Sequence, residues 1–134
     1  MDIAARTRLS LLLLRIGVFI VMLMWTLDKF VRPGHAAGVF KKFYHIELAS
    51  PTVFYVLGAL ELALILLFVS GTAKRLSYGA VLVLHAVSTF SSYRQYLQPF
   101  DSLLFFAAWP MLAACVALYL LRDLDTLWAV ERKP

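Results

Sequence analysis

Three ionisable side chains lie inside otherwise apolar segments of this sequence: Arg15, Glu61 and His85. Charged side chains are costly inside a membrane, so each one indicates a pairing or a function. At about 1.5 Å per residue, Glu61 and His85 each lie about 14 Å from an end of their helix, near the bilayer midplane. Arg15 lies about 9 Å inside its helix. We therefore expect a central polar pair of Glu61 with His85 or of Glu61 with Arg15.

Such a pair allows two interpretations. In the functional one, it is a proton relay or a hydrogen-bonding site for a quinone-like headgroup, because burial and neighbouring charges control whether a carboxyl group carries its proton. In the structural one, it is an interhelical polar contact worth about 1 kcal/mol or less. The residues alone leave both interpretations open.

A polar stripe extends from His85 toward the end of the same segment. Its members recur at spacings of three and four residues and so share one helix face: His85, Ser88 or Thr89, Ser92, and Gln95 or Tyr96. The stripe either faces other helices or lines a polar cleft. At the outer surface we expect a polar cluster, with Arg94 paired to Asp28 or Asp101, whose members are Asp28, Lys29, Tyr93, Arg94 and Asp101.

Four apolar segments of near-spanning length must position these side chains, at about residues 9–27, 52–70, 76–92 and 103–121. Without water, each must be helical to satisfy its backbone hydrogen bonds. We therefore predict an all-α, single-domain integral membrane four-helix bundle over residues 1–134, with a kink at Pro110. Aromatic residues and lysines at 39–46 have near-helical spacing, which predicts a short amphipathic surface helix between the first two spans.

Lys and Arg are more numerous on the side that holds both termini. That side carries Arg6, Arg8, Lys74, Arg75, Arg122, Arg132 and Lys133, and the other carries Lys29, Arg32, Lys41, Lys42 and Arg94. We expect a bacterial-type inner membrane with both termini cytoplasmic.

The composition also excludes several classes of protein. Of the 134 residues, 62% are hydrophobic and 16% charged, which is too apolar for a soluble domain. The net charge of +5 fits contact with anionic lipid better than binding to nucleic acid. The single cysteine, Cys115, excludes an intrachain disulfide. No His, Cys, Asp or Glu cluster has metal-ligand spacing, so we expect no metal site.

Three motifs together resemble the DoxX-like family of small four-helix membrane proteins. They are the exit of the first segment from Phe19 to Phe30, the run Leu57-Gly58-Ala59-Leu60-Glu61, and the turn Val69-Ser70-Gly71-Thr72-Ala73-Lys74-Arg75. Trp25 stands where that family usually has a small residue. The resemblance implies a four-helix bundle that serves as a membrane subunit or accessory of a redox system, with Glu61 and Arg75 at the family's glutamate and arginine positions.

Three functional hypotheses follow. The first is an accessory subunit, non-catalytic by itself or contacting a quinone, of a larger membrane redox complex. The second is a proton-coupled transporter that works as a homodimer through Glu61. The third is a membrane enzyme that uses Glu61 and His85 as acid and base on a lipid-like substrate. The candidate ligand- or proton-binding residues are Glu61, His85, Arg15, Ser88 and Ser92.

Overall fold

The computed structural model describes residues 1–47 and 50–132, and over these residues the chain is all-helical, without strands. The prediction of an all-α fold is therefore confirmed. Lys133, which contributes to the predicted orientation, lies outside the described residues.

Nine helical elements follow one another along the described chain. They are α1 (Ile3–Val31), α2 (Pro33–Val39), the π-helix η1 (Phe40–Tyr44), α3 (Pro51–Val69), α4 (Lys74–Ser91), α5 (Tyr93–Tyr96), the 3₁₀-helices η2 (Pro99–Asp101) and η3 (Leu103–Ala107), and α6 (Ala108–Leu120).

Local sequence sets several of these boundaries. The Asp2 side chain accepts a hydrogen bond from the Ala5 amide and caps the start of α1. Pro33 and Pro51 each occupy the first residue of their helix, where a missing N–H costs nothing. Pro110 also lies in the first turn of α6, directly after the change from 3₁₀ to α geometry at Ala107. A continuous α-helix therefore does not run through Pro110, because the helical stretch changes from 3₁₀ to α geometry just before the proline.

Three helical stretches are long and apolar enough to cross a membrane, namely Ile3–Val31, Pro51–Val69 and Leu103–Leu120. The third combines η3 and α6. The remaining long helix, α4, is more polar because it carries His85 and several serines and threonines. The length and apolar composition of these helices thus support a membrane protein with three candidate spans.

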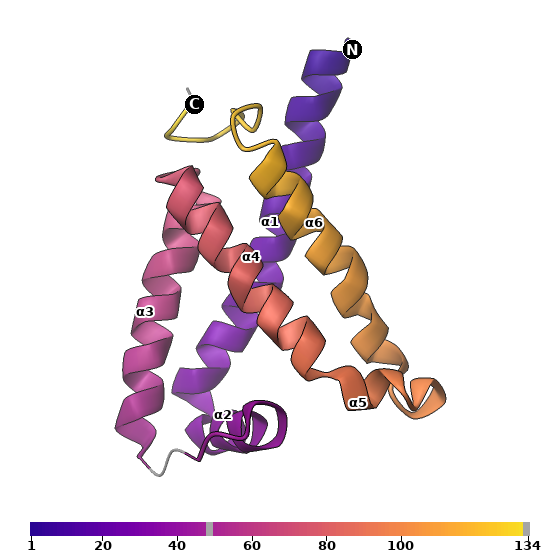
Figure 1. Ribbon diagram of the computed structural model, residues 1–134. Coiled ribbons are helices and arrows are strands. Elements are labelled where there is room, and N and C mark those ends of the chain that lie inside the picture. The colour runs from indigo at the N-terminus through magenta and orange to yellow at the C-terminus, as the bar shows by residue number, and fades with distance from the viewer. Residues whose placement is uncertain (48–49, 133–134) are drawn as a thin grey trace.

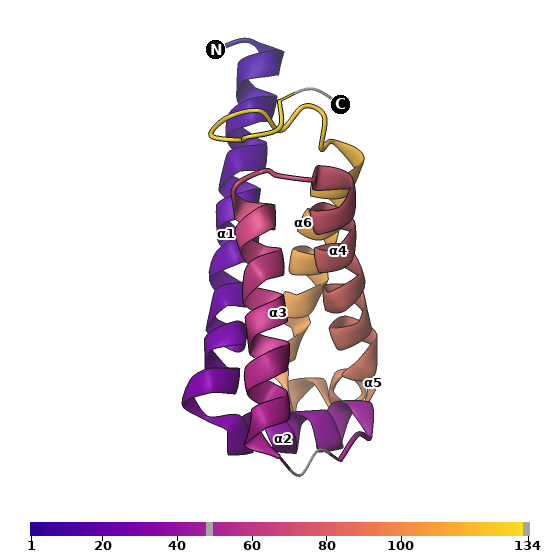
Figure 2. The same cartoon turned by 90° about the vertical axis from the view of Figure 1, so that its left-hand side faces the viewer.

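The four longest helices form two pairs, with α1 on α3 and α4 on α6, and contacts between α3 and α4 join the pairs. Figure 1 shows α1 and α6 crossing near the end where the chain begins and diverging toward the end that α2 covers. We call these the terminal end and the α2 end. Figure 2 shows α2 running across the ends of the long helices at the α2 end.

The hydrophobic core lies in the half nearer the terminal end. Its buried members come from all four long helices and include Leu11, Val18, Ile65, Val81 and Leu118. The short helix expected at 39–46 is found as η1, continuous with α2, with Lys41 and Lys42 exposed. The two halves of the molecule are therefore packed differently.

Candidate functional site

Glu61 forms its ion pair with a residue that the sequence did not suggest. Its Oε2 lies 3.0 Å from the Lys29 Nζ, and its Oε1 accepts a 2.8 Å hydrogen bond from the Thr26 hydroxyl. The expected pair of Glu61 with His85 or Arg15 is therefore wrong. The physical reason is that α1 and α3 pack along their length, which brings the last turns of α1 against the middle of α3.

Arg15 instead pairs with Asp125, from the segment that follows α6. Its Nη1 lies 3.0 Å from the Asp125 Oδ1, and both side chains are almost completely buried, with 1% and 0% exposed. The Tyr78 hydroxyl donates a 2.6 Å hydrogen bond to the other Asp125 oxygen. We call Arg15, Asp125, Tyr78 and Lys74 the terminal cluster.

Lys74 completes this cluster at the start of α4, before the expected third span. Its ammonium donates to the backbone carbonyls of Arg122 and Asp125. Burial lowers the pKa of Lys74, and the nearby Asp125 carboxylate acts in the opposite direction. Lys74 therefore anchors the segment after α6 to the start of α4.

The segment after α6 also joins the turn between α3 and α4. The amides of Val130 and Glu131 donate to the carbonyls of Ser70 and Gly71, at 2.8 and 2.9 Å. Ala129 packs so closely on Gly71, which has a φ of +68°, that a Cβ at Gly71 would lie 2.6 Å from the Ala129 Cβ. The terminal end is thus closed by the chain's own last described residues.

His85 contacts the start of α6. Its Nε2 lies 3.0 Å from the Ala108 carbonyl oxygen, which can only accept, so Nε2 carries the hydrogen. Residue types and spacing placed His85 on an interior face, and the structure buries it there with 9% exposed. Its partner is a backbone carbonyl, which no side-chain pattern indicates.

A cavity of about 1120 Å³ begins beside the hydrophobic core and extends toward the α2 end, between α1, α4 and the η3–α6 segment. Most of its wall is apolar, with Val18, Met22, Leu84, Met111 and Ala114 among the lining residues. Known ligand pockets usually measure about 300–1,000 Å³. The cavity is therefore large enough for a long amphiphilic molecule.

Polar groups gather in one part of this wall. Lys29 and Glu61 line it from α1 and α3, and His85, Ser88 and Ser92 line it from α4. Four of the five sequence-derived ligand candidates thus share one cavity, whereas Arg15 belongs to the terminal cluster. Lys29, expected only as a member of an outer-surface cluster, lies beside Glu61 at the cavity.

The α2 end of the cavity is closed by aromatic rings. Phe40 in η1 packs edge-on against Phe54 of α3, and Phe43 lies 6.0 Å from Phe105 of η3, measured between ring centres. The Lys29 Nζ lies 5.9 Å from the centre of the Phe40 ring. The ion pair is therefore positioned directly beneath this aromatic cover.

The cavity opens to the side, where α1 and η3 diverge. Lining residues on both edges are exposed: 51% of Trp25 and 40% of Val21 on α1, and 89% of Leu104 on η3. In a membrane, such an opening faces lipid rather than water.

The hydroxyls of the polar stripe bond mainly within their own helix. The hydroxyls of Thr89 and Ser92 donate to the carbonyls of His85 and Ser88 in the preceding turn. Ser88 and Ser92 also line the cavity. Farther along, Tyr96 packs on Phe106 and Trp109, and burial raises the pKa of its phenol.

The expected outer-surface cluster divides into separate contacts. Asp28 accepts from Arg32 at 2.8 Å and contacts the His35 Nδ1, and together these residues join α1 to α2. Arg94 donates to the neighbouring Tyr93 hydroxyl, and Asp101 lies in η2. The predicted pairing of Arg94 with Asp28 or Asp101 is absent from the described residues, because local partners satisfy Asp28 and Arg94.

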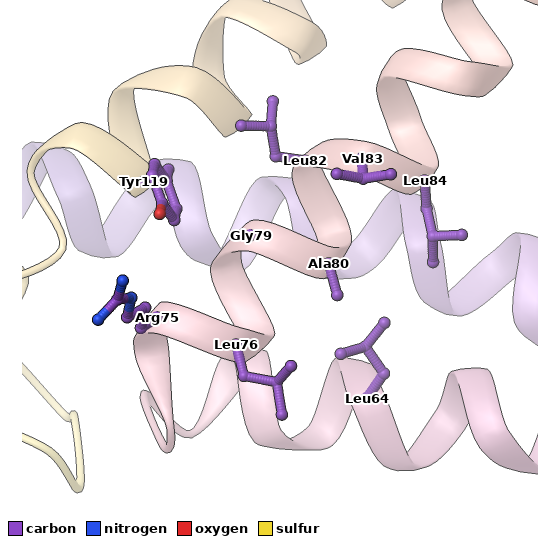
Figure 3. A pocket seen from close by; sticks show the side chains of 9 residues that line it. All are labelled: Leu64, Arg75, Leu76, Gly79, Ala80, Leu82, Val83, Leu84 and Tyr119. Carbon is purple, nitrogen blue, oxygen red and sulfur yellow. The ribbon is translucent and has the colours of Figure 1, made fainter.

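A second, shallower hollow of about 600 Å³ lies on the outside of α4. Figure 3 shows it between Leu64 of α3 and Tyr119 of α6, with Gly79 and Ala80 at its base and Arg75 at one end. Its wall is apolar apart from Arg75 and Tyr119. It is a surface groove between helices and lacks the convergent polar groups of the cavity.

The cavity has the groups to hold a ligand and to hydrogen-bond it. Among residues 1–47 and 50–132, no three His, Cys, Asp or Glu side chains come together as a metal site would require. No family model, curated protein or solved structure matches the chain.

Proposed function

We propose that this protein is a small integral membrane subunit that holds a lipid-soluble, quinone-type ligand and works within a larger membrane redox complex. The observation that carries the proposal is the cavity, which combines long apolar walls with the Lys29–Glu61 pair and His85. Apolar ligand sites usually have this composition, with a few polar groups that fix orientation. The resemblance to the DoxX-like family supports the same assignment.

The proposal includes four membrane crossings, with α4 as the fourth. Its hydroxyls at Thr89, Ser91 and Ser92 bond to carbonyls of their own helix, which lowers the cost of placing them in lipid. The α1 start and the segment after α6 lie at the same end of the molecule (Figure 1). The excess of Lys and Arg at that end supports the proposal that it lies on the cytoplasmic side of a bacterial-type inner membrane.

The transporter hypothesis receives less support. A proton-coupled carboxylate must be free to exchange its proton for a substrate cation, whereas Glu61 already has a cation from its own chain at 3.0 Å. The enzyme hypothesis needs His85 and Glu61 to exchange protons with one substrate, and each of them already has a separate partner.

The first test is native purification in mild detergent, followed by mass spectrometry of co-purifying chains and of extracted lipids. We expect a redox protein in stoichiometric amount and a quinone in the extract. Purification of the chain alone and without quinone would contradict the proposal.

Gly17→Phe provides the matched loss-of-binding variant. Gly17 lines the cavity, and a Cβ there meets no atom within 4 Å, so a larger side chain begins in open space at the cavity wall. Gly38→Phe is the control, because Gly38 also has open space but does not line the cavity. We expect Gly17→Phe to lose the bound quinone and Gly38→Phe to retain it.

A further inference from the structure

The charges that line the cavity cancel. Among the described lining residues, Lys29 and Glu61 are the two that carry formal charges, and their Nζ and Oε2 atoms are 3.0 Å apart. The other polar groups of the wall are neutral hydroxyls, aromatic polar groups and His85, whose Nε2 already donates to a carbonyl. The polar part of the cavity therefore holds hydrogen-bonding groups without a net charge.

This balance decides which headgroups the cavity can hold. A phosphate or carboxylate brought to Lys29 would also approach Glu61, and it would lose its water shell without gaining an unpaired counter-charge. An ammonium group brought to Glu61 would also approach Lys29, and it would likewise lose its water shell without gaining an unpaired counter-charge. An uncharged group avoids this cost. A hydroxyl can accept from the Lys29 ammonium and donate to the Glu61 carboxylate, and a carbonyl can accept from the Lys29 ammonium.

The rest of the cavity suits the hydrocarbon portion of the same molecule. Its wall runs from the ion pair along Met22 and Val18 toward the core, and it opens between α1 and η3 to what would be the bilayer interior. The hydrophobic core, which shares Val18 and Met22 with the cavity wall, bounds one end, and the aromatic rings of η1 close the other. An amphiphile can therefore enter from the lipid with its headgroup directed to the pair.

We propose that the cavity selects uncharged amphiphiles, whose carbonyl or hydroxyl headgroup binds the Lys29–Glu61 pair, and rejects amphiphiles with a charged headgroup. This inference rests on the proposed function, since it requires that the cavity hold a ligand. It follows from the charge balance of the cavity, and it therefore applies to any neutral lipid-soluble compound, whether or not that compound is a quinone.

The test uses three photoreactive probes that share one alkyl chain and end in an alcohol, a carboxylate or an amine. The purified full-length protein is labelled in nanodiscs of neutral lipid, and labelled peptides are mapped by mass spectrometry. We expect saturable labelling of cavity residues by the alcohol, at a concentration about tenfold or more below that of either charged probe.

Two variants should change this preference in opposite directions. Glu61→Gln leaves Lys29 without its counter-charge, so the carboxylate probe should become the preferred ligand. Lys29→Gln leaves the Glu61 carboxylate without its counter-charge, so the amine probe should become the preferred ligand. The double variant carries neither charge and should keep the preference for the alcohol. Saturable labelling of the double variant would show that the two substitutions do not unfold the cavity.

Asp28→Asn is the matched control, because it removes one negative charge near the same end of α1 but from a residue paired with Arg32 and His35. It should leave the order of the probes unchanged. Equal binding of all three probes, or a preference that neither single variant alters, would overturn the inference while the proposed function stands. Absence of saturable cavity labelling by every probe would contradict the proposed function itself, and this inference with it.

Discussion

The two ends of this molecule each contain an ion pair that joins α1 to another segment, and the two pairs differ in their surroundings. Arg15 and Asp125 are 1% and 0% exposed and are surrounded by Tyr78, Lys74 and backbone carbonyls. Lys29 and Glu61 are 10% and 17% exposed and border a cavity. The first pair lies where the long helices converge, and the second lies where they diverge.

This difference indicates that the two ion pairs have different roles. A fully buried pair packed among Tyr78, Lys74 and backbone carbonyls has no room for a ligand, so its role is to hold the last described segment onto the helices. A pair at a cavity wall retains hydrogen-bonding capacity toward the cavity. Removing one partner should therefore damage stability most at the terminal end.

The largest effect is expected for Asp125→Ala. It leaves the Arg15 guanidinium buried without a counter-charge, a change that typically costs about 3–5 kcal/mol. We expect a large fall in the melting temperature of the detergent-solubilised protein, followed by circular dichroism. The matched control is Asp123→Ala, because Asp123 is exposed, and its loss should change stability by less than about 0.5 kcal/mol.

A fall for Asp125→Ala no larger than for Asp123→Ala would show that the terminal cluster is not what holds this end together. The same measurement on Glu61→Gln sharpens the comparison. The amide can still accept from the Thr26 hydroxyl, so we expect a smaller loss there than for Asp125→Ala.

An intermediate effect is expected for Gly71→Ala. The left-handed φ of +68° costs a residue with a Cβ about 1–2 kcal/mol, and the added methyl group would overlap Ala129. We expect a lower melting temperature and faster proteolysis of the segment after α6. Gly34→Ala is the control, since a Cβ there meets open space, and faster proteolysis in both variants would contradict the argument.

Much of the helical framework could be predicted from the sequence, because apolar segment length and helix-capping residues are local signals. The expected segments at 9–27 and 52–70 fall on α1 and α3. Pro33 and Pro51 begin helices, which is where proline is favoured, whereas Pro110, at which the sequence predicts a kink, lies in the first turn of α6.

The pairing of polar side chains could not be predicted, since it depends on helix rotation and on contacts between distant segments. Arg15 and Asp125 are separated by most of the chain. Asp125 lies outside every apolar segment, where a charged residue is common and does not indicate a buried ion pair. Lys29 looked like an ordinary charge at a helix end. That it reaches Glu61 follows from the packing of α1 on α3, which one sequence does not specify.

The smallest effect is expected for His85→Leu, which tests the cavity half directly. The substitution removes one interhelical hydrogen bond, from His85 to the Ala108 carbonyl, and such bonds in membranes are worth about 1 kcal/mol or less. We expect a small fall in melting temperature, well below that of Asp125→Ala. Thr89→Val is the matched control on the same helix, because the Thr89 hydroxyl bonds only within α4, and its loss should be close to neutral. A fall for His85→Leu as large as for Asp125→Ala would mean that the cavity half is held as tightly as the terminal end, and the contrast between the two ends would then be wrong.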